Sequence, residues 1–123
     1  MTLAAGDKDS SRLDEEDVAR YVLSRRTPAG GYCFYRTPSW GIEEPNALDT
    51  LAAVASLGLL GVPCPNPEET GRWVQGLQME DGTYSTLTIG WAALSTLNLL
   101  GFKPSREPWR WIDAACDGII REI

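Results

Sequence analysis

Apolar residues recur at helical spacing along this chain, in two kinds of pattern. In the first kind they alternate with charged residues. Val18, Tyr21 and Val22 follow it, which predicts an amphipathic helix that begins near Ser11 and ends before Pro28. In the second kind nearly every position is apolar. A helix without a polar face is buried all round or packed between neighbours.

The same two patterns predict four further helices. The segments from about Asn46 to Leu60 and from about Thr88 to Leu100 are apolar on nearly every side. The segments from about Pro67 to Met79 and from about Glu107 to Glu122 are amphipathic. A glycine directly follows each apolar segment, as is common where a helix ends. The expected order is therefore amphipathic, apolar, amphipathic, apolar, amphipathic.

The pattern also repeats. Tyr21–Tyr32 aligns with Trp73–Tyr84 at an offset of 52 positions, with an aromatic residue, Val, Gly and Tyr in register. Leu51–Gly61 aligns with Trp91–Gly101 at an offset of 40 positions. The first repeat therefore carries a 12-residue insertion between its two helices. Aligned blocks in the same order are the sequence signature of a repeat architecture.

Together these observations predict one all-α domain over residues 11–123, after a flexible N-terminus at residues 1–10. Its helical-hairpin repeats span about 12–61 and 66–101, and a half repeat spans about 105–122. Helical hairpins stack with their apolar helices inside and their amphipathic helices outside, which buries a continuous core.

Charge and composition narrow the functions that this fold could serve. The net charge of −6, from 11 basic and 17 acidic residues, argues against non-specific nucleic-acid binding. No apolar run is long enough to span a membrane and the first ten residues lack a secretory pattern, so we expect a cytoplasmic location. The three cysteines form no CxxC pair, and the chain contains no histidine. Catalytic systems that depend on histidine are thereby excluded.

Two segments resemble the repeats of protein prenyltransferases and squalene and terpene cyclases. Trp73–Tyr84 is similar to their W-L-x-x-x-Q-x-x-D-G-G segment, which an aromatic residue follows. Leu48–Gly61 is similar to the D-T-x-x-A-x-x-x-L-x-L-L-G inner helix, which follows that segment within each repeat of the family. The resemblance covers residues 12–122 and implies part of an α/α toroid, whose full ring of five to seven hairpins encloses an apolar cavity for an isoprenoid chain.

The catalytic groups implied by this resemblance are largely missing. Prenyltransferases bind zinc through an Asp, a Cys and a His, so a chain without histidine cannot form that site and we expect no metal or cofactor. Cyclases protonate their substrate with the middle Asp of D-x-D-D-T. The matching stretch Asn46–Thr50 has Leu48 at the proton donor and keeps only Asp49 as a catalytic candidate. Asp49 could instead bind the exposed amides of the first helical turn.

The insertion and one inner helix supply the candidate ligand-binding residues. Phe34, Tyr35, Arg36 and Trp40 could line a cavity mouth, with Arg36 binding a diphosphate through paired hydrogen bonds. Alternatively, these aromatic residues cap an exposed end of the helical core. Trp91 would face a cavity from the second inner helix, or would be part of the core.

Two hypotheses about function follow. The first is a non-catalytic binding or assembly module for an apolar, isoprenoid-like ligand or a partner chain. The second is a subunit or fragment of a prenyltransferase- or cyclase-like enzyme that acts on isoprenoid diphosphates. Because about half a ring would leave apolar helix faces in water, we expect a homo-oligomer or a partner chain to complete it.

Overall fold

The chain folds into five α-helices, as described by a computed structural model for the backbone of residues 3–35 and 44–122 and for the side chains of residues 14–35 and 44–117. No strand occurs in these ranges, which confirms the all-α prediction. No helix in them has both the length and the apolar character needed to cross a membrane. The helices are α1 (Leu3–Ser24), α2 (Ala47–Leu60), α3 (Pro67–Gln75), α4 (Leu87–Leu100) and α5 (Trp109–Glu122).

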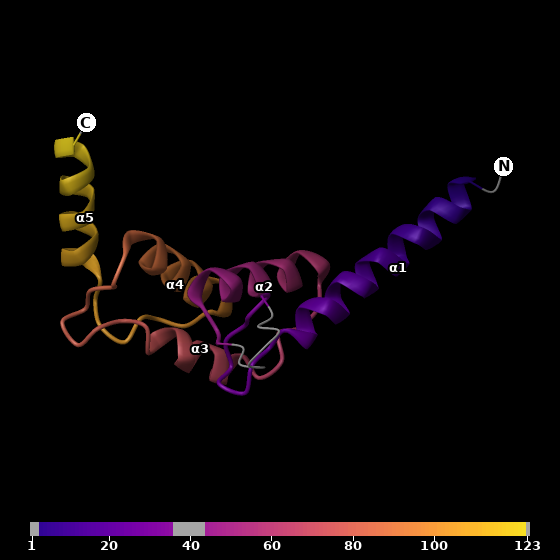
Figure 1. Ribbon diagram of the computed structural model, residues 1–123, viewed down its shortest axis with the longest axis horizontal. Coiled ribbons are helices and arrows are strands. Elements are labelled where there is room, and N and C mark those ends of the chain that lie inside the picture. The colour runs from indigo at the N-terminus through magenta and orange to yellow at the C-terminus, as the bar shows by residue number, and fades with distance from the viewer. Residues whose placement is uncertain (1–2, 36–43, 123) are drawn as a thin grey trace.

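The two apolar helices lie side by side at the centre of the molecule (Figure 1). α1 packs on α2, and α3 packs on α4, so each apolar helix is covered by the helix that precedes it in the chain. We therefore call α2 and α4 the inner helices, and α1, α3 and α5 the outer helices. The N-terminal part of α1 and the helix α5 extend from opposite ends of this arrangement (Figure 1).

The helix boundaries agree with the sequence pattern where a cap marks them. The Asn46 side chain accepts a hydrogen bond from the Asp49 N–H, and Thr86 accepts one from the Ile89 N–H. Asn46 and Thr86 are 40 positions apart, as are the two left-handed glycines that end α2 and α4. A side-chain oxygen at the N-cap satisfies a free backbone donor, and this fixes where each helix begins.

Two outer helices differ from the prediction. α1 begins at Leu3 rather than near Ser11, so residues 3–10, which we expected to be flexible, are helical. Those residues contain no proline that would interrupt a helix. α3 ends at Gln75 rather than Met79, because the Leu77 N–H donates to the Val74 carbonyl and closes a tight turn.

The turn that follows each outer helix has the same geometry in both repeats. Gly30 has φ 103° and Gly82 has φ 89°, a conformation that glycine adopts without steric cost. The Gly30 N–H donates to the Thr27 carbonyl at 3.0 Å, and the Gly82 N–H donates to the Met79 carbonyl at 2.9 Å. The offset of 52 positions therefore describes a repeat of structure as well as of sequence.

Each hairpin has a small hydrophobic core of its own. The members of the two cores correspond one to one at the offsets of 52 and 40 positions. The first core consists of Val22, Tyr32, Ala53 and Leu57, and the second consists of Val74, Tyr84, Ala93 and Leu97. Stacked hairpins thus repeat one packing arrangement, as in other repeat proteins.

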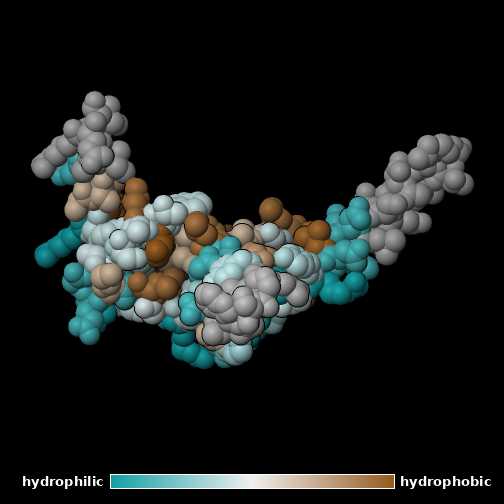
Figure 2. Space-filling view, in the orientation of Figure 1, coloured by the Kyte–Doolittle hydropathy of each residue, from teal (hydrophilic) through white to brown (hydrophobic). Residues whose placement is uncertain are grey.

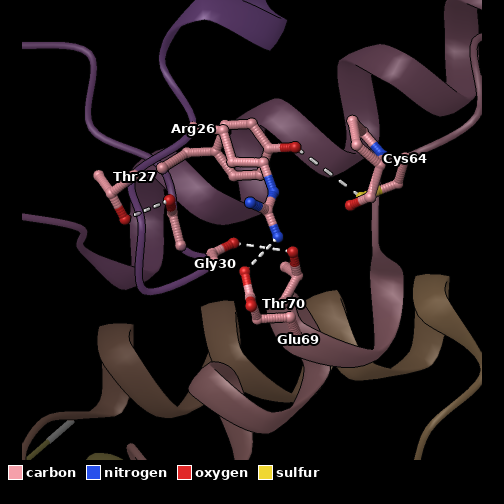
Figure 3. Close-up of polar contacts among 9 residues, drawn as sticks. Arg26, Thr27, Gly30, Cys64, Glu69 and Thr70 are labelled. Carbon is pink, nitrogen blue, oxygen red and sulfur yellow. Dashed lines mark hydrogen bonds and ion pairs between the residues drawn. The ribbon is translucent and has the colours of Figure 1, made fainter.

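Polar contacts join the first hairpin to the second (Figure 3). The Arg26 guanidinium forms an ion pair with Glu69 at 2.6 Å, and the Thr70 hydroxyl donates to the Gly30 carbonyl at 2.7 Å. We call this contact the first junction. Both partners of the Thr70–Gly30 hydrogen bond are buried, so each satisfies a polar group that would otherwise lack a partner.

A second junction joins the second hairpin to α5. The Gln78 amide donates to the Arg106 carbonyl at 2.9 Å and accepts from the Arg106 N–H at 2.9 Å. Gln78 lies 52 positions after Arg26, so equivalent positions hold the next unit at both junctions. α5 is therefore attached in the manner expected of a third outer helix.

The inner helices are packed between neighbours rather than buried on every side, which is the second of the two alternatives that the sequence left open. Leu59 of α2 is 89% exposed and Trp91 of α4 is 57% exposed. Each inner helix is covered by one outer helix and one inner neighbour, and its remaining face is open. The all-round apolar pattern therefore marks helices that would be enclosed only if further chain or ligand covered that face.

Candidate functional site

Asp49 holds the start of the insertion against α2. Its carboxylate accepts hydrogen bonds from the Phe34 N–H at 2.8 Å and from the Asn46 side-chain amide at 2.8 Å. The Asp49 N–H itself is capped by Asn46. The carboxylate of Asp49 thus binds a backbone donor from a different segment rather than the amides of its own helical turn.

Phe34 lies at the edge of the first hydrophobic core. Its ring stacks on Tyr21 of α1, with ring centroids 5.9 Å apart and an interplanar angle of 29°. The ring is half-buried and packs against the residues of the first core. This placement agrees with the alternative in which the aromatic residues of the insertion cover an end of the helical core.

Tyr35 is more open to solvent than Phe34. It is 47% exposed, and its hydroxyl donates to the Glu44 carbonyl at 3.4 Å. Arg36 and Trp40, the other two candidates in the insertion, lie outside the described residues.

A buried arginine positions this segment, and the sequence analysis did not find it. Arg25 is 4% exposed, and its Nε–H donates to the Cys33 carbonyl at 2.8 Å. A second guanidinium N–H of Arg25 reaches the Tyr35 carbonyl at 3.5 Å. Aligning the two repeats could have pointed to Arg25, because the second repeat has the apolar Leu77 at the equivalent position. A charged residue at a position that is apolar in the other repeat suggests a specific role.

Trp91 belongs to a different part of the surface. Among the described residues, the aromatic pairs are Tyr21–Phe34 and Tyr84–Trp111, and neither includes Trp91. The structure therefore does not join Trp91 with Phe34 or Tyr35, the described aromatic residues of the insertion, in one aromatic cluster.

Trp91 instead belongs to an apolar surface formed by the inner helices. Figure 2 shows hydrophobic residues along the upper side of the molecule in that view, over α2 and α4. α4 contains no charged residue, and Asp49 is the only one in α2. We call this surface the inner-helix face and define it by its large exposed side chains, Leu48, Leu59, Leu87, Trp91 and Leu99.

A second open feature lies at the C-terminal end of the array. A cavity of about 580 Å³ separates the end of α4 from α5, with the connecting segment 102–108 as its floor. We call it the terminal groove. Its lining is apolar in part, with Leu94, Leu97, Phe102, Trp109 and Ile112, and polar in part, with Asn98 of α4 and with Lys103, Arg106 and Glu107 of the connecting segment. Phe34, Tyr35 and Trp91, the predicted ligand-binding residues that the structure describes, do not line this groove.

The described cysteines and acidic residues do not form a metal site. Within residues 14–35 and 44–117, no three side chains of His, Cys, Asp or Glu lie close enough together to hold an ion. The three cysteines are unpaired, and Cys33 is buried while Cys116 is exposed.

The fold and its surfaces define a class, an all-helical hairpin-repeat protein with an open apolar face on its inner helices. No protein-family model, curated protein or solved structure matches the chain.

Proposed function

We propose that this chain is a non-catalytic repeat module of the prenyltransferase and terpene-cyclase type, which binds an apolar, isoprenoid-like ligand or a partner chain on its inner-helix face. The observation that carries the proposal is the concentration of large exposed hydrophobic side chains on two neighbouring helices that hold a single charge. Exposed apolar surfaces of this kind usually mark interaction sites.

The energetic argument is simple. Full burial of one large apolar side chain contributes about 1.5–3 kcal/mol. Several such side chains are exposed on the inner-helix face, so covering it would contribute enough for a specific complex after the costs of association. A charged or strongly polar ligand would gain little there. In a toroid of the kind that the resemblance implies, the same face would line an apolar cavity.

The non-catalytic part of the proposal rests on the residues at the expected acid position. Leu48 occupies the place of the proton donor and cannot supply a proton. The Asp49 carboxylate accepts two hydrogen bonds that hold the insertion, one from a backbone N–H. These contacts give the Asp49 carboxylate a role in positioning the insertion.

Binding of a fluorescent farnesyl chain without a diphosphate tests the proposal. We expect saturable binding that weakens about tenfold or more in the double variant Leu59→Gln/Trp91→Gln, since burial of both side chains is lost. The matched control is Val18→Gln/Met79→Gln, which changes two exposed apolar residues outside the inner-helix face. Equal loss in both double variants would contradict a specific site.

Turnover tests the enzyme alternative. We expect no product when the chain is incubated with isoprenoid diphosphates, with or without zinc or magnesium. Product that is formed by the chain and lost in Asp49→Asn, with the helical circular dichroism unchanged, would overturn the non-catalytic assignment.

A further inference from the structure

Equivalent positions on the two inner helices differ in burial at one edge. Ala92 and Thr96 of α4 are both fully buried. Their equivalents on α2, 40 positions earlier, are Ala52, which is exposed, and Ser56, which is half-buried. This difference is expected if the Ala92–Thr96 edge of α4 packs on α2, because no inner helix precedes α2 in the described chain. Small side chains four positions apart allow two helices to approach closely.

The opposite edge shows the reverse difference. Val54 of α2 is 6% exposed, whereas its equivalent on α4, Leu94, is only half-buried and lines the terminal groove. Asn98 also lines the groove, whereas its equivalent Gly58 is exposed and a Cβ there would meet no atom within 4 Å. The edge of α4 that lines the groove therefore corresponds to the edge of α2 that packs against α4.

The second wall of the groove is an outer helix without an inner helix packed on it. α1 packs on α2 and α3 packs on α4, but no described helix follows α5 to take the same place. α5 is nevertheless held in position. Trp111 contacts Tyr84 edge to face at 5.2 Å and fills the space above Gly90, where a Cβ would overlap its ring.

We propose that the terminal groove binds an apolar α-helix of another polypeptide, one that packs on α4 as α4 packs on α2. Such a helix has small residues four positions apart on the side that meets α4, as Ala92 and Thr96 are, and no charge on that side. This inference rests on the proposed function, because a partner chain is one of the two ligands named there. The α2–α4 contact within this chain is the template for the complex.

The repeat geometry also explains why the occupant is a single helix. α5 already fills the outer position, so a hairpin that brought its own outer helix would compete with α5 for the same place. A second copy that docked its α2 on α4 would bring its α1 with it. A lone helix with the pattern of an inner helix avoids this conflict.

A peptide copied from this chain is the probe. A fluorescein-labelled peptide of residues 86–102, with lysines added at its C-terminus for solubility, is titrated with the full chain, and the anisotropy is measured. We expect saturable binding with one peptide per chain. The same peptide with Ala92→Gln and Thr96→Gln should bind about tenfold more weakly or worse, because long polar side chains would prevent the close approach.

Two variants of the protein locate the binding. Asn98→Arg places a charge in the groove, and Thr88→Arg makes the matched change at an exposed position of α4 that does not line it. We expect Asn98→Arg to weaken peptide binding about tenfold or more and Thr88→Arg to leave it within about twofold. Circular dichroism should show unchanged helix content in both.

Three results would overturn the inference. One is equal peptide binding by the Asn98→Arg and Thr88→Arg variants. Another is a concentration-dependent dimer of the chain alone that Asn98→Arg abolishes, since a second copy would then occupy the groove. The third is loss of farnesyl binding in Asn98→Arg without any peptide binding, which would assign the groove to a small ligand.

Failure of this inference is distinguishable from failure of the proposed function. If the peptide does not bind but the farnesyl chain binds and depends on Leu59 and Trp91, only the groove assignment is wrong. If neither the peptide nor the farnesyl chain binds, the proposed function fails as well.

Discussion

Two buried threonines donate hydrogen bonds in different settings, one between hairpins and one within a helix. The Thr70 hydroxyl crosses the first junction to the Gly30 carbonyl at 2.7 Å, whereas the Thr96 hydroxyl donates within its own helix to the Ala92 carbonyl at 2.7 Å. We predict that Thr70→Val lowers the free energy of unfolding by about 1–3 kcal/mol, because the Gly30 carbonyl would be buried without that partner.

Thr96→Val is the matched control for this change. Its acceptor keeps a place in the helical hydrogen-bond ladder, so we expect a loss of less than about 0.5 kcal/mol. Urea unfolding followed by circular dichroism measures both variants. Equal losses would show that the junction hydrogen bond does not stabilise the contact between hairpins.

The buried tyrosines make stability depend on alkaline pH. Burial raises the pKa of Tyr84 above its usual value of 10.0. The pKa of Tyr32 is also raised, chiefly by burial and to a smaller extent by the neighbouring Cys64. A group with a raised folded-state pKa contributes its full stabilisation below the unfolded-state pKa and loses it as the pH rises. We therefore predict constant stability from these groups below about pH 10 and a decline above it.

Tyr84→Phe tests this assignment. The Tyr84 hydroxyl is buried without a hydrogen-bond partner among the described residues, so its removal should be neutral or slightly stabilising near pH 8. The variant should also lose less stability than the parent between about pH 8 and about pH 11. Urea midpoints at the two pH values give the comparison, and an unchanged pH dependence would contradict it.

Two helical glycines offer a matched pair of substitutions. A Cβ added at Gly58 of α2 would meet no atom within 4 Å, whereas one at Gly90 of α4 would overlap the Trp111 ring. We predict that Gly58→Ala stabilises the protein by about 0.5–1 kcal/mol, since alanine loses less conformational entropy in a helix.

Gly90→Ala should instead destabilise the protein by about 1–3 kcal/mol, because Trp111 and therefore α5 would have to move. Thermal unfolding measures both variants. Stabilisation by both would mean that α5 does not pack closely on α4.

The inner helices were the elements that the sequence predicted best. Asn46 and Thr86 cap them, and Gly61 and Gly101 end them, so their boundaries differ from the prediction by one residue at most. These signals lie within a few residues of each helix end, so they can be recognised without knowing how the rest of the chain folds. The end of α3 was harder to place, because the prediction passed over Gly76, which directly follows Gln75, and the tight turn from the Leu77 N–H to the Val74 carbonyl.

The candidate site was harder to predict than the helices. Phe34 and Asp49 were singled out as separate candidates, and only the fold shows that the Asp49 carboxylate binds the Phe34 N–H. The role of Arg25 depends on three-dimensional contacts with the carbonyls of Cys33 and Tyr35. The terminal groove arises from the relative placement of α4 and α5, which no periodicity within either helix encodes.

For the molecule as a whole, the open face of the inner helices predicts self-association at high protein concentration. Leu59 is the most exposed of its large side chains, at 89%, so a charge there has little effect on folding. We predict that Leu59→Glu lowers the average molar mass measured by light scattering after size exclusion. Val18→Glu on α1 is the control and should leave it unchanged. Equal masses for Leu59→Glu and the parent would exclude this face from the association.

The arrangement of one hairpin after another has a consequence for how the protein opens. α4 contacts both α2 and α3, whereas α5 is held through the second junction and a few contacts of Trp111. In such a linear array the ends open before the middle. Backbone amides of α5 should therefore exchange with deuterium much faster than those of α4. A helix bound in the terminal groove would slow the exchange of α5 most, so the rate at this one helix reports whether the array has been extended.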